Sequence, residues 1–203
     1  MKSPSDISVA SRNQLREELR SKRKAINSKQ QAEASINLLR HLIKFPLFLK
    51  AKRIAVYLAS DGEMDLQPLI HQAWAMNKEV YLPVIKNKLS RELWFIHYTP
   101  ETRLTQNRYK ILEPDPHQNP RLAAHLLDIV FMPLVGFDAD KNRLGMGGGF
   151  YDTTFAFKKQ KPKSKPSLIG VAHECQRVEK IDVEEWDVKL DMMVTDKAVL
   201  IIK

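Results

Sequence analysis

The hydrophobic residues of this chain change their spacing at about residue 50. Before that point, apolar residues recur every three or four positions over residues 12–27 and again over 28–42. This spacing predicts two amphipathic helices. In the second helix it places Ile36, Leu39 and Leu42 on one face, which we expect to pack on the core.

From residue 53 onward, short apolar runs alternate with helical patterns. Runs of this length, bounded by turn residues, are typical of buried strands. They lie at residues 53–60, 79–83, 92–98, 128–133, 167–172, 192–195 and 198–202. Helical segments are predicted after Asp65, at residues 122–127 and from about residue 150. Strands that alternate with helices predict an α/β fold with a mostly parallel sheet.

The composition is that of a globular protein. The chain has 203 residues, 43% of them apolar and 28% charged, which excludes a mainly disordered chain and predicts one domain, with residues 1–10 as a flexible tail. We find no apolar run long enough for a membrane span and no signal peptide. Cys175 is the only cysteine, so no disulfide can form within the chain. These features together predict a cytoplasmic protein.

The charge balance favours anionic partners. Subtracting 24 acidic from 33 basic residues leaves a net charge of +9. Phosphate, carboxylate, nucleic acid or an acidic membrane surface would all be attracted by such a surface.

A glycine-rich segment is the most informative feature of the sequence. Four of the seven glycines lie within residues 145–149, after a predicted buried strand and before a predicted helix. Glycine permits positive φ and lets backbone N–H groups approach an anion closely. Arg143 and Asp152 flank the segment. Arg143 could supply a positive charge to a bound anion, and the Asp152 carboxylate could hold a cation that bridges phosphates. The spacing matches neither a P-loop nor GxGxxG. A tight structural turn is the alternative, and we favour phosphate binding.

The residues from 131 to 152, FMPLVGFDADKNRLGMGGGFYD, resemble the 5-formyltetrahydrofolate cyclo-ligase family. Supporting matches span nearly the whole chain, including RNQLREEL, YLASDGEMD and WDVKLDMMVTD. The resemblance implies a three-layer αβα fold similar to that of sugar-phosphate isomerases and CoA transferases. It also implies a monomeric ligase of folate one-carbon metabolism. This enzyme would convert ATP and 5-formyltetrahydrofolate into 5,10-methenyltetrahydrofolate, ADP and phosphate, with Mg²⁺.

The resemblance also implies site residues. ATP would contact the basic pair Arg12 and Arg16 and the segment comprising Arg143, Leu144, Gly145, Met146, Gly147, Gly148, Gly149, Phe150 and Tyr151. Within that segment, Arg143 and Tyr151 would be catalytic. The folate would contact Leu58, Glu63, Met146, Gly147, Gly148, Gly149 and Phe150. The magnesium ligands would be Asp152 and Asp191.

Each assignment has a purely structural alternative. Asp152 could be a carboxylate favoured by a helix N-terminus, and Asp191 a cap between loop and strand. The basic residues that follow Arg16 are interpreted as a solvated helix face, namely Arg20, Lys22, Arg23 and Lys24.

Other signals are weaker. His173 and Glu174 could begin a zinc motif of the HExxH type, but Arg177 occupies the position of its second histidine. Cys175 is expected to be partly buried and structural. Lys110 stays unassigned. The lysine-rich segment at residues 158–165 is predicted to be a solvated loop that could attract a polyglutamylated folate.

Two alternatives to the cyclo-ligase function stay open. The basic surface could bind nucleic acid, although no nucleic-acid motif is found. A paralogue could keep the fold and the nucleotide site but act on another substrate.

Overall fold

The computed structural model describes residues 4–87, 89–107 and 111–200, with side chains from residue 11 onward. Lys110 therefore lies outside the described residues. The main sheet has eight strands in the order β12-β11-β10-β7-β1-β2-β3-β6. Their bounds are β1 (Arg53–Ala55), β2 (Glu79–Ile85), β3 (Leu93–His97), β6 (Arg121–Leu122), β7 (Ile129–Pro133), β10 (Ser167–Val171), β11 (Met192–Val194) and β12 (Val199–Leu200). Two small antiparallel pairs are separate, namely β4 (Leu104–Gln106) with β5 (Leu112–Pro114), and β8 (Gly136–Phe137) with β9 (Arg143–Leu144).

The centre of the sheet is parallel, as predicted. β11, β10, β7, β1 and β2 pair in parallel, and antiparallel strands lie only at the two ends. β7 is central, with four of its five residues buried, as its continuous apolar sequence requires. The parallel strands all end at the same edge, which we call the carboxyl edge. Ligand sites of open α/β sheets form at this edge.

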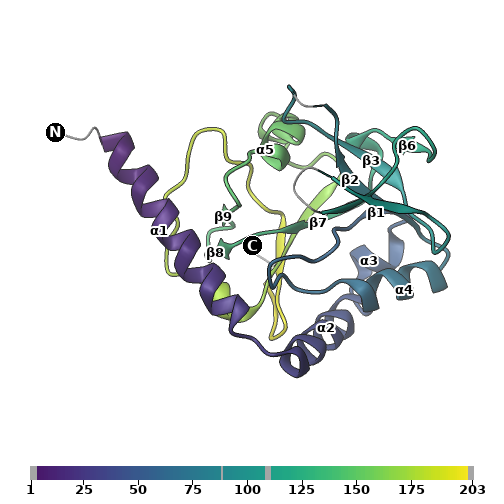
Figure 1. Cartoon of the computed structure of the whole chain (residues 1–203), viewed down its shortest axis with the longest axis horizontal. Coiled ribbons are helices and arrows are strands. Elements are labelled where there is room, and N and C mark those ends of the chain that lie inside the picture. Colours follow the sequence, from purple (N-terminus) through teal and green to yellow (C-terminus); the bar gives the residue numbers. More distant parts are fainter. Residues whose placement is uncertain (1–3, 88, 108–110, 201–203) are drawn as a thin grey trace.

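Helices cover both faces of the sheet (Figure 1). On one face lie α2 (Ser28–Leu42), α3 (Pro46–Lys50) and α4 (Gln67–Ala75), whose apolar side chains join those of the strands in one core cluster. The opposite face is covered by α5 (Phe150–Thr154), by 3₁₀ helices at Ala124–Leu126 and Ala156–Lys159, and by the segment at residues 178–190. The predicted three layers, helices on both sides of a sheet, are thus observed. The layer that contains α5 consists of short helices and an irregular segment. The likeness to sugar-phosphate isomerases and CoA transferases stays a prediction.

The inward face of α2 differs from the predicted one. The buried residues are Ala34, Ser35, Leu38 and Leu42, and Ile36 is exposed. At 3.6 residues per turn, Ile36 lies about 200° from Leu38 around the helix axis. Its prediction as a core residue was therefore wrong, because the small residues at 34 and 35 face the core in its place.

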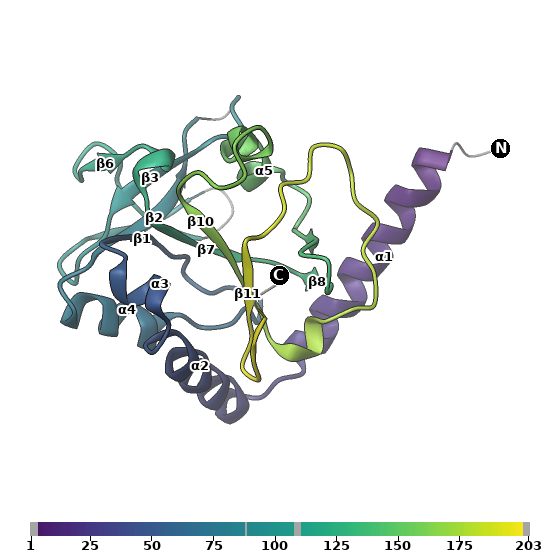
Figure 2. The same ribbon diagram turned by 180° about the vertical axis from the view of Figure 1, so that it is seen from behind.

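The first helix, α1 (Pro4–Lys24), extends into the predicted tail. Residues 4–10 are helical, and proline is well tolerated in a first helical turn. The flexible tail at residues 1–10 stays a prediction. Figures 1 and 2 show α1 beside the sheet, against the 3₁₀ helix Glu174–Gln176 that follows β10. Among the helices of the described ranges, none has the length and apolar character to cross a membrane.

Candidate functional site

The glycine loop, residues 145–149, exposes its backbone at the surface beside α5. Gly147 and Gly149 adopt φ values of 92° and 67°, a region that side chains with a Cβ rarely enter. Gly149 is also the N-cap residue of α5, directly before its first residue, Phe150. The sequence concentrates glycine here because the chain turns through left-handed conformations within a few residues.

Arg16 of α1 contacts this loop directly. Its Nε donates to the Gly145 carbonyl at 2.8 Å, and its guanidinium lies 3.8 Å from the position of a Cβ built on Gly147. Burial and the neighbouring Arg12 lower the pKa of Arg16. Arg12, one turn earlier, donates instead to the Asp182 carbonyl at 2.7 Å and to Asp187 at 3.1 Å. The predicted pair therefore links α1 to two segments, and only Arg16 contacts the glycine loop.

Arg143 and Asp152 form an ion pair at the base of the loop. Arg143 Nη2 lies 2.5 Å from Asp152 Oδ1, and a second guanidinium nitrogen donates to the Val188 carbonyl. The Val188 N–H donates back to Asp152 Oδ1 at 3.0 Å. Since Arg143 is only 6% exposed, its charge lies beneath the loop.

Asp191 is paired with a buried lysine. Lys158 Nζ lies 2.7 Å from Asp191 Oδ2, which also accepts the Leu168 N–H at 2.7 Å. Lys158 further donates to the carbonyls of Ser164 and Pro166 and is 5% exposed. The prediction of a fully solvated lysine loop was therefore wrong for Lys158, around which the segment folds.

The carboxylate of Glu63 lies close enough to Tyr151 to influence its ionisation. Burial raises the pKa of Glu63, whose Oε2 accepts the Ser60 N–H at 3.0 Å. Burial, followed by the charge of Glu63, raises the pKa of Tyr151 well above its usual range. Tyr57 is shifted in the same direction by the same two causes. Leu58 is partly buried and packs on the core at the start of this loop. Residues from β1, α5 and their loops thus meet at the carboxyl edge.

Comparison with known proteins identifies the family. The family model described as the 5-formyltetrahydrofolate cyclo-ligase family matches residues 8–196. The chain belongs to this family.

Relatives agree over almost their full length. A 5-formyltetrahydrofolate cyclo-ligase of Escherichia coli K12 is 42% identical over 181 residues, covering 89% of this chain and 98% of the relative. The Haemophilus influenzae enzyme of that name is 40% identical, with 93% and 100% covered. The NMR structure of Aquifex aeolicus 5,10-methenyltetrahydrofolate synthetase superposes with a TM-score of 0.80 at 28% identity, covering 95% and 93%. The resemblance seen in the sequence is therefore confirmed.

A buried arginine that sequence reasoning missed fixes the edge of the site in this family member. Arg23 is 1% exposed. It donates to the Asp61 carbonyl at 2.8 Å, to Asp61 Oδ2 at 2.9 Å and to the Leu134 carbonyl at 3.2 Å. Arg20 and Lys24 also pair with Asp61, at 2.7 and 2.5 Å. The interpretation as a solvated face was wrong for the buried Arg23, whereas Lys22 and Lys24 are exposed as predicted and Arg20 is half-exposed.

His173 and Cys175 are the remaining side chains that the sequence offered for chemistry. His173 is buried at the start of a 3₁₀ helix, and burial lowers its pKa. Cys175 is exposed as a residue, rather than partly buried as predicted. Partial desolvation of its thiol by neighbouring atoms raises the pKa of that group. A low thiol pKa is what a nucleophilic cysteine requires. Within the described ranges, we find no cluster of three or more residues able to hold a metal ion by themselves.

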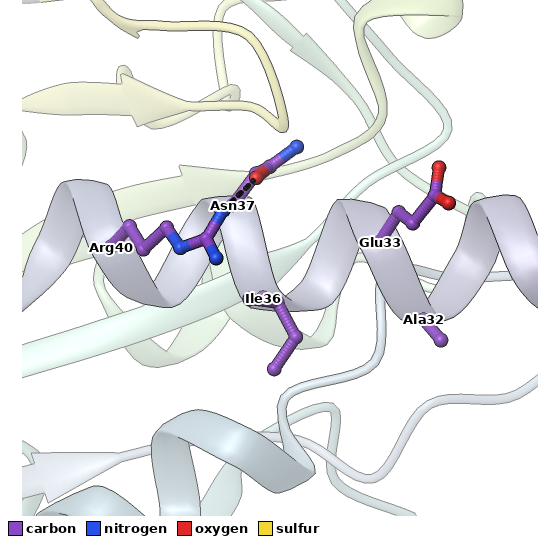
Figure 3. Close-up of a pocket in the computed structure, with 5 residues that line it drawn as sticks. All are labelled: Ala32, Glu33, Ile36, Asn37 and Arg40. Atoms are coloured by element: carbon purple, nitrogen blue, oxygen red, sulfur yellow. Dashed lines mark hydrogen bonds between the residues drawn. The ribbon is translucent and has the colours of Figure 1, made fainter.

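A separate hollow of about 440 Å³ lies along the outer face of α2. Figure 3 shows its lining of Ala32, Glu33, Ile36, Asn37 and Arg40, in which Arg40 donates to Asn37 at 3.1 Å. All five residues come from one helix. Since none of them belongs to the glycine loop or the loop with Glu63, we assign this hollow no part in the chemistry.

The pairing of Asp61 predicts a pH-dependent contribution to stability. Its hydrogen bond with Arg20, and those with Lys24 and Arg23, hold the pKa of Asp61 far below its usual range. A lowered pKa stabilises the fold above the ordinary carboxyl pKa, and this stability is lost as the pH falls. We expect Asp61→Asn to reduce the free energy of unfolding by about 1–2 kcal/mol at pH 7, measured by urea titration.

The difference between wild type and Asp61→Asn should shrink progressively below pH 4, because the Asp61 carboxyl then binds a proton in the unfolded chain more readily than in the folded protein. Glu18→Gln removes an exposed pair from the same helix and serves as the control, with an effect of less than about 0.5 kcal/mol. A pH-independent difference would contradict the ionic role of Asp61.

Proposed function

We propose that this protein catalyses the ATP-dependent cyclisation of 5-formyltetrahydrofolate to 5,10-methenyltetrahydrofolate, releasing ADP and phosphate. The observation that carries the proposal is the meeting of three features at one edge of the sheet. These are an exposed glycine loop, a cation held beneath it and a partly buried carboxylate near a partly buried tyrosine. Family membership supports this function.

The reaction needs activation of a poor electrophile. The γ-phosphoryl group is transferred from ATP to the formyl oxygen, which turns that oxygen into a leaving group. The adjacent folate nitrogen then attacks the formyl carbon, the ring closes, and phosphate departs with that oxygen. Proximity favours this intramolecular attack. The protein therefore has to align two substrates and stabilise phosphoryl charge.

The chain's own residues supply these two needs. Backbone N–H groups of residues 147–149 and the Arg16 guanidinium would hold the phosphates, with Arg12 as a second cation near them. Arg143 adds positive charge from below the loop, where burial strengthens its field. Because Tyr151 keeps its proton at neutral pH, its hydroxyl can donate a hydrogen bond to the formyl or phosphoryl oxygen. Glu63 can accept ring N–H groups of the pterin, with Leu58 against its apolar edge.

The residues present fit a magnesium ion that arrives with ATP. The polar contacts of Asp152 go to Oδ1 and those of Asp191 to Oδ2, so within the described part of the chain each carboxylate keeps one oxygen for a ligand. Mg²⁺ is commonly bound by one or two carboxylates together with substrate phosphates. When bound, it would neutralise phosphate charge. Arg143 neutralises Asp152, and Lys158 neutralises Asp191, without the metal ion.

An absorbance assay tests the function. Purified protein with ATP, Mg²⁺ and 5-formyltetrahydrofolate should show rising methenyl absorbance with stoichiometric release of ADP. ATP hydrolysis with another folate or none would support the paralogue. Retention of nucleic acid at physiological salt, without any cyclisation, would support the alternative of a nucleic-acid-binding protein. Cytoplasmic location and a monomeric state stay predictions.

The glycine loop assignment predicts the effect of a side chain at Gly149. Gly149→Val should weaken ATP binding by about tenfold, because a β-branched residue disfavours a φ of 67° by about 1–2 kcal/mol. Isothermal titration calorimetry with ATP measures this change. Gly149→Asn is the matched variant, since asparagine tolerates the left-handed region, and it should lose less affinity. Equal losses in both variants would place the cause in side-chain bulk instead of backbone conformation.

The magnesium assignment predicts that Asp152→Asn and Asp191→Asn each raise the Mg²⁺ concentration needed for half-maximal turnover. A carboxylate ligand is replaced by a neutral amide in both variants. Asp128→Asn is the control for Asp191→Asn, because Asp128 also pairs with a lysine, Lys165 at 2.6 Å, and also accepts backbone N–H groups. It should alter stability but leave the Mg²⁺ requirement unchanged. An unchanged requirement in Asp191→Asn would remove Asp191 from the metal site.

A further inference from the structure

Arg91 is an exposed cation beside the glycine loop. It lies in the turn between β2 and β3, and its side chain is exposed. Arg91 Nη1 lies 3.8 Å from the position of a Cβ built on Gly149. Within the described ranges, Arg91 has no hydrogen bond or ion pair. The neighbouring acid, Glu92, is instead bound by Lys86 at 2.6 Å.

The turn that carries Arg91 is held in place by its own hydrogen bonds. The Asn87 side chain accepts the N–H groups of Leu89 and Ser90, and the Lys86 N–H donates to the Glu92 carbonyl. The Leu93 N–H donates to Thr154 Oγ1 of α5 at 2.9 Å. Arg91 therefore belongs to a structured turn fastened to the helix that follows the glycine loop.

The position of Arg91 separates it from the cations assigned to ATP. α1, with Arg16, and β3 lie on opposite sides of α5 in Figures 1 and 2. Arg16 contacts the loop at Gly145 and Gly147, and Arg91 lies beside its last residue, Gly149. Gly149 is followed within two residues by Tyr151, which interacts with Glu63. Arg91 is thus at the end of the loop nearer the pair assigned to the folate ring.

We propose that Arg91 binds the glutamate carboxylates of the folate substrate. This inference rests on the proposed function. With the ring beside Glu63 and the formyl group facing the glycine loop, the rest of the folate has to leave toward the surface. Its ionised carboxylates then need a cation at the mouth of the site. A guanidinium suits them because its planar N–H groups match a carboxylate. In the lysine-rich segment, which was predicted to attract such a chain, Lys158 is buried and Lys165 is paired with Asp128.

Steady-state kinetics of Arg91→Ala tests the assignment. We expect the KM for 5-formyltetrahydrofolate monoglutamate to rise about two- to fivefold, which is the size of an exposed ionic contact. The KM for ATP and kcat should be unchanged. Arg91→Lys should recover part of the loss. The increase should be larger for a triglutamate substrate and should diminish in high salt.

Arg103→Ala is the matched control. Arg103 is also exposed, but it follows the end of the antiparallel strand β3 and so lies toward the opposite edge of the sheet. It removes the same charge and should leave the KM for the folate unchanged. A 5-formyltetrahydropterin without the glutamate should be bound equally by wild type and Arg91→Ala.

The outcomes separate the two hypotheses. An unchanged KM for the folate in Arg91→Ala, or a rise in the KM for ATP alone, overturns the carboxylate assignment, and the latter moves Arg91 to the phosphates. Absence of cyclisation by the wild-type protein overturns the proposed function instead. In that case, calorimetric titration of wild type and Arg91→Ala with the monoglutamate and triglutamate still tests Arg91. Equal affinities would overturn its role.

Discussion

The site depends on guanidinium groups that α1 inserts into the carboxyl edge of the sheet. Arg12, Arg16 and Arg23 reach the segment at 182–187, the glycine loop and the loop with Asp61, respectively. A buried guanidinium is strongly unfavourable unless its donors find acceptors. Each of these arginines finds carbonyl oxygens or carboxylates that only a single placement of the helix supplies. The helix and the loops therefore fix one another, and the geometry of the site follows from this mutual constraint.

Carboxylates paired with internal cations are a second feature of the site. Asp152 is held by Arg143, and Asp191 by Lys158. In each pair the cation is at most 6% exposed, whereas the carboxylate keeps some contact with solvent. The two carboxylates are therefore oriented by their cation partners before any ligand binds. A site arranged in this way needs little reorganisation when a charged ligand binds, which is the basis of electrostatic preorganisation.

Much of the fold could be predicted from the pattern of apolar residues. β7 and β10 are buried on both faces, so their sequences are continuously apolar and their assignment was direct. The glycine loop was evident because backbone conformation restricts which residues can occupy it. Ile36 was misplaced because α2 turns small residues, Ala34 and Ser35, toward the core, and apolar spacing gives such residues little weight.

The charged interior could not be predicted in the same way. Arg23 and Lys158 stand in basic stretches that look solvated, and their acceptors lie far away in the sequence or are backbone carbonyls. Nothing in the local sequence distinguishes Arg23 from Lys22. The signal that was available is the spacing of Arg20, Arg23 and Lys24, which share one helix face. The function of this face follows from the three-dimensional position of Asp61, with which all three cations pair.

The arginines of α1 also determine when the site can form during synthesis of the chain. Arg12 is separated from its acceptor Asp182 by 170 residues, and Arg23 from Leu134 by 111. A nascent chain leaves the ribosome from its N-terminus, so α1 emerges long before its partners. Until the segment at 182–187 has emerged, the docking that orders the glycine loop is incomplete. Nucleotide binding should therefore be acquired only after the segment at 182–187 has emerged from the ribosome.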